Sequence, residues 1–305
     1  MAPDRPVISR VVISTALGLA GRGVFPYTLL PAYRRLMQVV KDTGTTILSK
    51  SATRLPRTGN VLPWNPLTWW RYVKKLPDLG MLNAYGLTNP GAEQGARDLK
   101  ASQDLGLKVV PNFYPEFIRG TAVAIRDTLE ALEIYQAVLG PGFQALELNY
   151  SCPNSAEEIR ENVAQGLKCA KAVRQQFPAL FLIVKVSVCH PYEFAQKLEG
   201  LGVNALHAVN TVPYDLVYPP PGHPPSPMRG VGGGGVSGGP AFPLAYRYNA
   251  GLRAKVGLFL IMGCGVRNQD DVQKYFDLGA DAVSLCTLAL RAPDEARQLI
   301  LAYNG

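Results

Sequence analysis

One cysteine and two asparagines stand where an apolar segment of the chain gives way to a turn. Residues 146–149 alternate in the manner of a buried strand, and residues 151–154 form a turn in which Pro153 cannot continue a strand ladder. The thiol of Cys152 can act as a general base at such a strand end, with Asn149 and Asn154 binding a polar substrate. The alternative is a connecting loop in which Cys152 is a small apolar filler and the asparagines cap turns.

Polar residues recur at the carboxyl ends of successive predicted strands. A barrel brings these ends to one mouth, where side chains from different strands can meet around a ligand. Lys185 is the most informative, because it lies in the apolar run 183–188, where a charge is costly unless it is paired. An anionic cofactor group would pair with it, and the alternative is a lysine that reaches solvent at the rim. The strand-end residues are Lys50, Ser51, Asn83, Asn112, Asn149, Lys185, Asn210 and Thr211.

Two glycine-rich turns lie beside the last predicted strands. One spans residues 232–239 and the other residues 263–265, and Cys286 and Thr287 follow the final strand. Glycine lets backbone N–H groups approach an anion closely, and barrels commonly bind phosphate after their seventh and eighth strands. The pair of turns therefore predicts a phosphate site, although either turn alone could be a flexible surface loop.

Strand and helix patterns alternate along the whole chain, which predicts parallel βα units. Residues 81–85 also read as a strand, but no periodic helix separates them from the preceding strand, so we assign them to a loop over the mouth. Residues 219–239 are then a long active-site loop, and the fold class is a (β/α)8 TIM barrel forming one domain, residues 1–305. The predicted barrel strands are residues 11–16, 44–51, 108–113, 146–149, 181–186, 205–211, 258–262 and 282–285.

Composition excludes several other classes of protein. The chain has 305 residues, of which 47% are hydrophobic and 18% charged, so it can bury a large core. No apolar run is long enough to cross a bilayer and no signal peptide is present, which predicts a cytoplasmic protein with no membrane span. Its five cysteines and three histidines lack metal-ligand spacing, so no metal is expected. The net charge of +8 comes without a dense basic tract, and no nucleic-acid partner is predicted.

Residues 45–290 resemble the dihydroorotate dehydrogenases, with the motifs of that family in its order. Residues 147–154 (Glu-Leu-Asn-Tyr-Ser-Cys-Pro-Asn) are similar to the family signature, in the class 1 form that carries cysteine at the base position. Residues 50–53, 83–89 and 234–238 resemble the family's Lys-Ser-x-Thr segment, its substrate loop and its flavin loop. Within these motifs Val266 and Cys286 stand where the family usually has glycine, which crowds the phosphate turn.

The resemblance implies an FMN-dependent oxidation of (S)-dihydroorotate to orotate in de novo pyrimidine biosynthesis. Cys152 would be the general base, and Lys185 would stabilise the reduced flavin. The substrate-binding residues it implies are Lys50, Asn83, Tyr85, Gly86, Leu87, Asn149, Asn154, Asn210 and Thr211. The FMN-binding residues it implies are Ala16, Gly18, Lys50, Ser51, Asn112, Asn149, Lys185, Gly235, Ser237, Gly238, Cys264, Gly265, Cys286 and Thr287.

Partners and rival functions stay open at this point. The resemblance implies a homodimer, with electrons passing to fumarate or, through an electron-transfer subunit, to NAD. One rival is another FMN-dependent pyrimidine reductase, similar to the flavin domain of dihydropyrimidine dehydrogenase. Another is a non-catalytic flavoprotein subunit. A tRNA dihydrouridine synthase would suit the pI of about 9.2, but such enzymes add an RNA-binding domain for which no residues remain here.

Overall fold

The alternating strands and helices form a parallel barrel in the computed structural model, which describes residues 8–15, 30–62, 64–151 and 156–305. The barrel sheet has nine strands in the order β5-β2-β1-β13-β12-β9-β8-β7-β6. Its two edge strands, β5 (Val109–Val110) and β6 (Asn112–Phe113), are separated only by Pro111, so the sheet closes on itself. Pro111 has no N–H to donate to the strand ladder, which explains why one predicted strand is observed as two. The predicted (β/α)8 barrel is confirmed.

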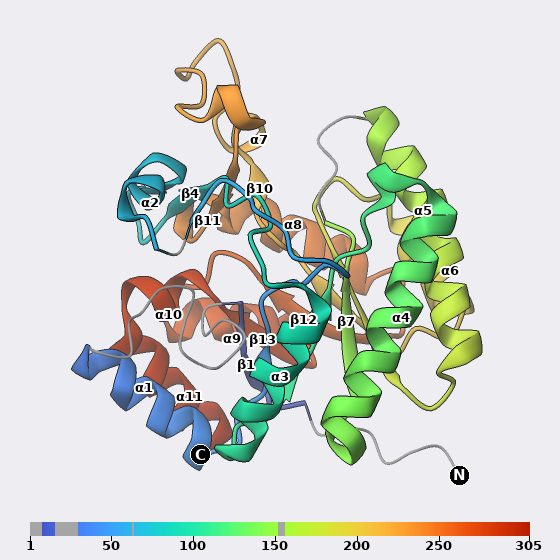
Figure 1. The fold of residues 1–305 in the computed structure, drawn as a ribbon. Coiled ribbons are helices and arrows are strands. Elements are labelled where there is room, and N and C mark those ends of the chain that lie inside the picture. Colours follow the sequence, from blue (N-terminus) through green and yellow to red (C-terminus); the bar gives the residue numbers. More distant parts are fainter. Residues whose placement is uncertain (1–7, 16–29, 63, 152–155) are drawn as a thin grey trace.

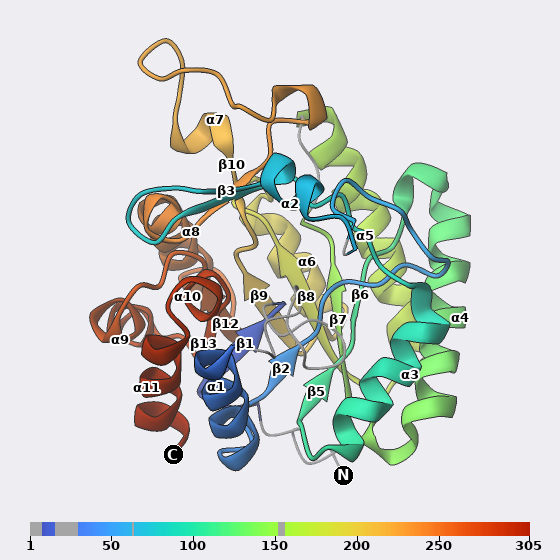
Figure 2. The same cartoon turned by 60° about the vertical axis from the view of Figure 1, so that its left-hand side comes forward.

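Helices follow the barrel strands in the expected order and surround them (Figures 1 and 2). Several predicted strands are shorter than expected, because only part of each run pairs with both neighbours; residues 44–51, for example, contribute only β2. The other barrel strands are β1 (Val11–Ser14), β2 (Ile47–Leu48), β7 (Ala145–Asn149), β8 (Phe181–Val186), β9 (Ala205–Ala208), β12 (Phe259–Gly263) and β13 (Ala282–Leu285). The surrounding helices are α1 (Pro31–Asp42), α3 (Gly91–Asp104), α4 (Thr121–Leu139), α5 (Ala156–Gln176), α6 (Tyr192–Gly200), α8 (Phe242–Arg253), α9 (Gln269–Asp277), α10 (Thr287–Arg291) and α11 (Pro293–Asn304).

Strand alternation divides the barrel side chains into an outer and an inner set. Along β8, Leu182 and Val184 pack in the apolar core that includes residues of the surrounding helices. Phe181 and Ile183 belong to a separate apolar cluster built from alternate positions of the barrel strands, and Lys185 lines a cavity. Because side chains alternate between the two faces of a strand, residues 181, 183 and 185 rise through the barrel interior from an apolar base to a polar mouth.

A second, smaller sheet covers the mouth of the barrel. It is antiparallel, in the order β10-β11-β4-β3, and lies with α2 (Pro66–Tyr72) and α7 (Tyr214–Val217) over one end of the barrel (Figures 1 and 2). Its strands are β3 (Val73–Lys75), β4 (Met81–Asn83), β10 (Val212–Pro213) and β11 (Gly235–Ser237).

The small sheet corrects part of the sequence analysis. Residues 81–85 do lie outside the barrel, as predicted, but residues 81–83 are a strand rather than loop, because their backbone pairs with β3 and β11. The segment 219–239 likewise ends in a paired strand, β11. The sequence pattern gave no sign of these pairings, since each strand is only two or three residues long.

The last helix is joined to the first strand by one side chain, that of Asn304. Its Oδ1 accepts from the Val11 N–H at 2.9 Å, and its Nδ2 donates to Val11 O and to Thr45 Oγ1, each at 2.8 Å. These bonds bind α11 to β1 and to the start of β2.

We expect Asn304→Ala to lower the free energy of unfolding by about 2 kcal/mol, because three hydrogen bonds are lost and the Val11 N–H loses its side-chain acceptor, while Val11 O keeps its bond from Ser9 Oγ. Urea unfolding followed by circular dichroism measures this change. Gln273→Ala is the matched control, since it removes one exposed hydrogen bond to Asp277. Equal stability of the two variants would contradict the assigned role of Asn304.

Candidate active site

A cavity of about 420 Å³ opens at the carboxyl ends of the barrel strands. Its floor comes from inward-facing residues of the barrel, such as Lys185, His207 and Ser284, and its cover comes from the small sheet, including Val73 and Met81. A volume of this size is typical of a site for a cofactor or another small molecule. The cavity therefore lies where the strand-end residues were expected to meet.

Most of the predicted site residues line this cavity. Two that the structure describes do not: Asn112, which is 1% exposed, and Gly238. Cys152, Asn154, Ala16 and Gly18 fall outside the described residues, so their predicted roles stay predictions. The residues that line the cavity as predicted are Lys50, Ser51, Asn83, Tyr85, Gly86, Leu87, Asn149, Lys185, Asn210, Thr211, Gly235, Ser237, Cys264, Gly265, Cys286 and Thr287.

Hydrogen bonds between side chains hold the asparagines of the cavity in place. Asn149 Nδ2 donates to Ser51 Oγ at 2.9 Å, while Asn149 Oδ1 accepts from both the N–H and the hydroxyl of Ser151. Asn210 Nδ2 in turn donates to Ser151 Oγ at 2.7 Å. Residues after β2, β7 and β9 are thus joined in one chain, which orients two amides at the mouth before any ligand binds.

Two lysines place positive charge at the cavity. Lys50 Nζ lies 4.0 Å from the centre of the Tyr85 ring, a cation–π contact, and burial lowers the pKa of Lys50 to about 8. Lys185 is 5% exposed and donates from Nζ to Ser14 Oγ at 3.1 Å. Both ammonium groups line the same cavity, so the site is suited to anionic ligands.

Neighbouring atoms lie so close to the glycines of the two turns that a side chain would not fit there. A Cβ on Gly235 would lie 2.1 Å from Thr211 Oγ1, and a Cβ on Gly263 would lie 2.0 Å from Ser284 Oγ. Gly265 has φ +102°, which other residues rarely adopt, and its backbone lies against Phe242. Thr287 Oγ1, just after the last strand, donates to Ser237 Oγ of the first turn at 2.8 Å. Ser237, Gly265 and Thr287 all line the cavity, so both turns and the end of the last strand border it, as a phosphate site requires.

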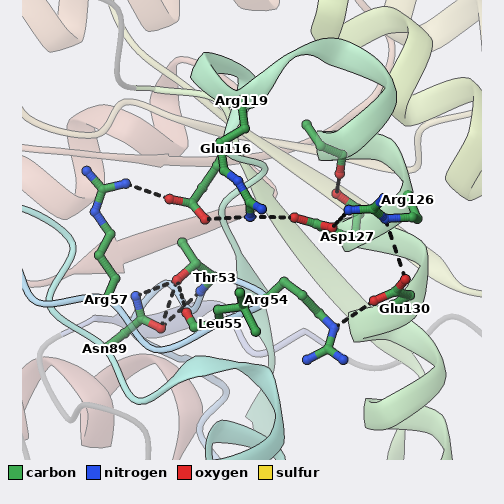
Figure 3. A network of polar contacts seen from close by, with 12 residues as sticks. Thr53, Arg54, Leu55, Arg57, Asn89, Glu116, Arg119, Arg126, Asp127 and Glu130 are labelled. Atoms are coloured by element: carbon green, nitrogen blue, oxygen red, sulfur yellow. Dashed lines mark hydrogen bonds and ion pairs between the residues drawn. The ribbon is translucent and has the colours of Figure 1, made fainter.

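The segment after β2 is tied to α4 by a network of ion pairs, which we name the Arg54–Arg57 network (Figure 3). Arg57 Nη1 lies 2.6 Å from Glu116 Oε1, and Arg54 Nε lies 2.9 Å from Glu130 Oε2. The backbone N–H and the hydroxyl of Thr53 both donate to Asn89 Oδ1, and Asn89 Nδ2 donates to Thr53 Oγ1. Arg57 also lines the cavity, so this network fixes part of its wall.

Sequence reasoning missed several of the residues that line the cavity. Arg57 and Asn60 lie in a segment without periodicity, where no pattern marks a single residue. His207 and Ser284 lie inside strands that were predicted, and strand alternation could have identified them as inward-facing in register with Lys185 and Gly263. The signal was present for these two, but it becomes informative only when the barrel register is known.

Cysteines in the described part of the chain are poor candidates for a base. Burial raises the pKa of Cys169 to about 11 and that of Cys264 to about 12. Burial also raises the pKa of Cys286, which outweighs the charges of Lys185 and Lys50 nearby. These three thiols therefore stay protonated at neutral pH.

Within the described ranges, no group of three or more His, Cys, Asp or Glu side chains could hold a metal ion. No helix of the described chain is long and apolar enough to span a bilayer. The cavity is lined by amides, hydroxyls, thiols, glycine turns, His207 and the cations Lys50, Arg57 and Lys185. This set can bind a flat polar ligand and an anionic group in one cavity.

Comparison with known proteins points to one family. The family model described as dihydroorotate dehydrogenase matches residues 35–300. The catalytic subunit of dihydroorotate dehydrogenase B (NAD(+)) from Geobacillus kaustophilus is 30% identical over 251 residues, which are 79% of this chain and 72% of that protein. The corresponding subunit from Bacillus caldolyticus is 28% identical over 252 residues, with the same coverage of 79% and 72%. The structure of Eimeria tenella DHODH in complex with ferulenol superposes with a TM-score of 0.60 at 17% identity, over 85% of this chain and 75% of that one, a likeness of fold.

Lys50 should titrate near pH 8, because burial disfavours its charged form. Below that pH the ammonium is charged, and above it the affinity for a carboxylate ligand should fall by up to about tenfold per pH unit. NMR of protein carrying ¹³C-labelled lysine measures the titration, and Lys50→Met assigns the signal. Lys100→Met, which removes an exposed lysine paired with Asp104, is the control. A Lys50 signal that titrates near 10.5 would contradict the burial argument.

Proposed function

Because the chain belongs to the dihydroorotate dehydrogenase family and is an oxidoreductase that acts on CH–CH groups, we propose that it oxidises (S)-dihydroorotate to orotate with FMN as its cofactor. The observation that carries the proposal is the meeting of Lys50, Asn149, Lys185 and Asn210 with the two glycine turns in one cavity. Each of these features was expected from a different part of the sequence. Their convergence supports a site for one aromatic cofactor and one small anionic ring.

The residues present fit FMN on two observations. At Gly235 and Gly265 the neighbouring residues leave no room for a side chain. The turns therefore present backbone groups rather than side chains, as binding of a phosphate requires. The ammonium groups of Lys50 and Lys185 line the same cavity and suit an anionic cofactor. When bound, FMN supplies a two-electron acceptor for hydride. The residues that would hold it are Ser51, Asn112, Lys185, Gly235, Ser237, Gly238, Cys264, Gly265, Cys286 and Thr287, together with Ala16 and Gly18 outside the described ranges.

The amides of the cavity would hold the substrate ring. Asn149 and Asn210, already oriented through Ser51 and Ser151, would bond its carbonyl and N–H groups, and Asn83 lies on the covering sheet. Lys50 would bind the substrate carboxylate. Oriented groups of this kind reduce the entropy cost of reaching the transition state. Tyr85, Gly86, Leu87, Thr211 and Asn154 complete the proposed substrate contacts.

The proton removed from the ring carbon would pass to the thiolate of Cys152. Because the other thiols at the cavity, Cys264 and Cys286, have raised pKa values, neither competes for this role. Lys185 would place positive charge where negative charge accumulates as the substrate is oxidised.

Partners follow from the relatives rather than from the site. The names of the relatives specify a catalytic subunit and NAD(+), which supports an electron-transfer subunit as partner and NAD as final acceptor. A homodimer and a cytoplasmic location are part of the same proposal.

Anaerobic mixing with dihydroorotate should bleach the yellow FMN-loaded protein, because substrate oxidation transfers two electrons to the flavin. Stopped-flow absorbance measures the rate, and the matched control is dihydrouracil, which lacks the carboxylate that Lys50 would bind. Reduction by NADPH with reoxidation by uracil would instead identify a pyrimidine reductase. A protein that binds FMN but is reduced by neither donor would be a non-catalytic flavoprotein subunit.

Cys152→Ala should bind FMN and orotate normally yet reduce its flavin orders of magnitude more slowly, because only the base is removed. In the wild type the rate should rise with pH until the thiol, whose pKa is ordinarily about 8.5, is ionised. Cys152→Ser should retain some activity with a pH dependence moved upward, since a hydroxyl is a much weaker acid. Cys189→Ala, at a thiol that does not line the cavity, is the control. Near-wild-type reduction by Cys152→Ala would remove the proposed base.

A further inference from the structure

A buried polar chain inside the barrel runs from below the cavity, at Glu147, to its floor, at His207 and Ser284. Glu147, on β7, is fully buried, and its Oε1 lies 2.5 Å from Nδ1 of His207 on β9, which is 1% exposed. His207 Nε2 lies 2.8 Å from Ser284 Oγ on β13. Asn112 Nδ2 donates to the other carboxylate oxygen, Oε2. Every atom of this chain is inside the barrel, where an apolar side chain would be the ordinary occupant.

The protonation states of this chain follow from its surroundings. Burial favours the neutral carboxylic acid, but the hydrogen bonds from His207 and Asn112 and the charge of Lys185 outweigh it, so the pKa of Glu147 lies below its ordinary value. Burial and the charge of Lys185 together lower the pKa of His207, despite the opposing effect of Glu147. The consistent state is a carboxylate that accepts from His207 Nδ1–H and a neutral imidazole whose Nε2 accepts from the Ser284 hydroxyl.

Lys185 is the positive charge that balances this carboxylate. β8 lies between β7 and β9, and Lys185 pairs in register with Asn149 on one side and with His207 on the other. The titratable groups that act on or respond to its ammonium are Glu147, His207, Cys264 and Cys286. Of these, only Glu147 is anionic at neutral pH, since the histidine is neutral and the two thiols are protonated.

No direct contact joins Lys185 to Glu147 in the described structure; Lys185 Nζ donates to Ser14 Oγ instead. The interaction therefore acts through space in a buried region, where screening by water and salt is weak. This arrangement leaves the ammonium at the cavity surface, free to face a ligand, while its counter-charge is held one layer below by two hydrogen bonds.

We propose that Glu147 is a positioning residue, a buried counter-charge that holds the Lys185 ammonium in place at the cavity floor. His207 and Ser284 hold the carboxylate in turn, and Ser284 lies against the Gly263 turn, so the same chain reaches both the lysine and the glycine turn. The catalytic consequence, positive charge kept ready where the substrate is oxidised, rests on the proposed function. The coupling between Glu147 and Lys185 does not.

A double-mutant cycle on flavin-free protein tests the coupling. Lys185→Met should lower the melting temperature, because it leaves a buried carboxylate without its counter-charge. Adding Glu147→Gln, which keeps the shape and removes the charge, should restore more than half of that loss. Lys100→Met combined with Glu147→Gln is the control, and its effects should add. Additive effects of Lys185→Met and Glu147→Gln would overturn the proposal.

The pH dependence of the same cycle gives a second measurement. The Glu147 pKa is depressed in the folded protein, so the stability it contributes is present above the carboxyl's unfolded pKa of about 4.3 and is lost as the pH falls through the folded value. The melting-temperature difference between wild type and Lys185→Met should therefore widen as the pH rises through this range. The same melting-temperature difference should not change with pH when both proteins carry Glu147→Gln. A flat difference in both backgrounds would contradict the coupling.

If Lys185→Met does not fold, Glu147→Gln alone still decides the question. FMN affinity and flavin reduction by dihydroorotate are measured on loaded wild type and Glu147→Gln across pH. A rate difference between the two proteins that closes as the pH falls and Glu147 becomes protonated supports the proposal, because only the charged carboxylate holds the ammonium in place. Superimposable profiles would overturn it. A protein that does not oxidise dihydroorotate would contradict the proposed function, and FMN affinity across pH would then report on the coupling independently.

Discussion

The alternation of side chains along the barrel strands is the constraint from which the site follows. On β7 the inward positions are Ala145, Glu147 and Asn149, and on β8 they are Phe181, Ile183 and Lys185. The apolar residues Ala145, Phe181 and Ile183 close the base of the barrel. Glu147 is buried above them, Lys185 lies at the floor of the cavity, and Asn149 lies at its mouth. A shift of one residue in either strand would turn the cavity-lining side chains toward the helices and the core side chains toward the cavity. The pairing register must therefore be maintained.

Burial of charge is the cost that this arrangement carries. A carboxylate inside a barrel is destabilising unless hydrogen bonds and an opposite charge compensate it, and His207, Asn112 and Lys185 supply these. Lys50 carries its own cost, because burial lowers its pKa to about 8 although its ammonium lies against the Tyr85 ring. Of the two lysines at the cavity, Lys185 thus interacts with a buried carboxylate, whereas Lys50 lies against an aromatic ring.

The sequence predicted the barrel from local patterns, and most of the site residues that it named in the described chain do line the cavity. Strand alternation, helical periodicity and glycine turns are each readable within about ten residues. The small sheet was not predicted, since β4 and β11 are paired only in three dimensions and each is three residues long. Arg57 was missed for a related reason: its partner, Glu116, is far away in the sequence. His207 and Ser284 were missed although their strands were predicted, because their contact depends on the register between strands.

The cover of the cavity is built from two excursions of the chain, one after β2 and one after β9, that meet as β4 and β11. Neither excursion contributes a strand to the closed barrel. Substitutions, insertions and deletions in them can therefore accumulate without opening the barrel ladder, whereas the floor residues are bound to its register. In evolution such a division lets the cover of the cavity diverge while the floor residues Lys185, His207 and Ser284 keep their places in the barrel.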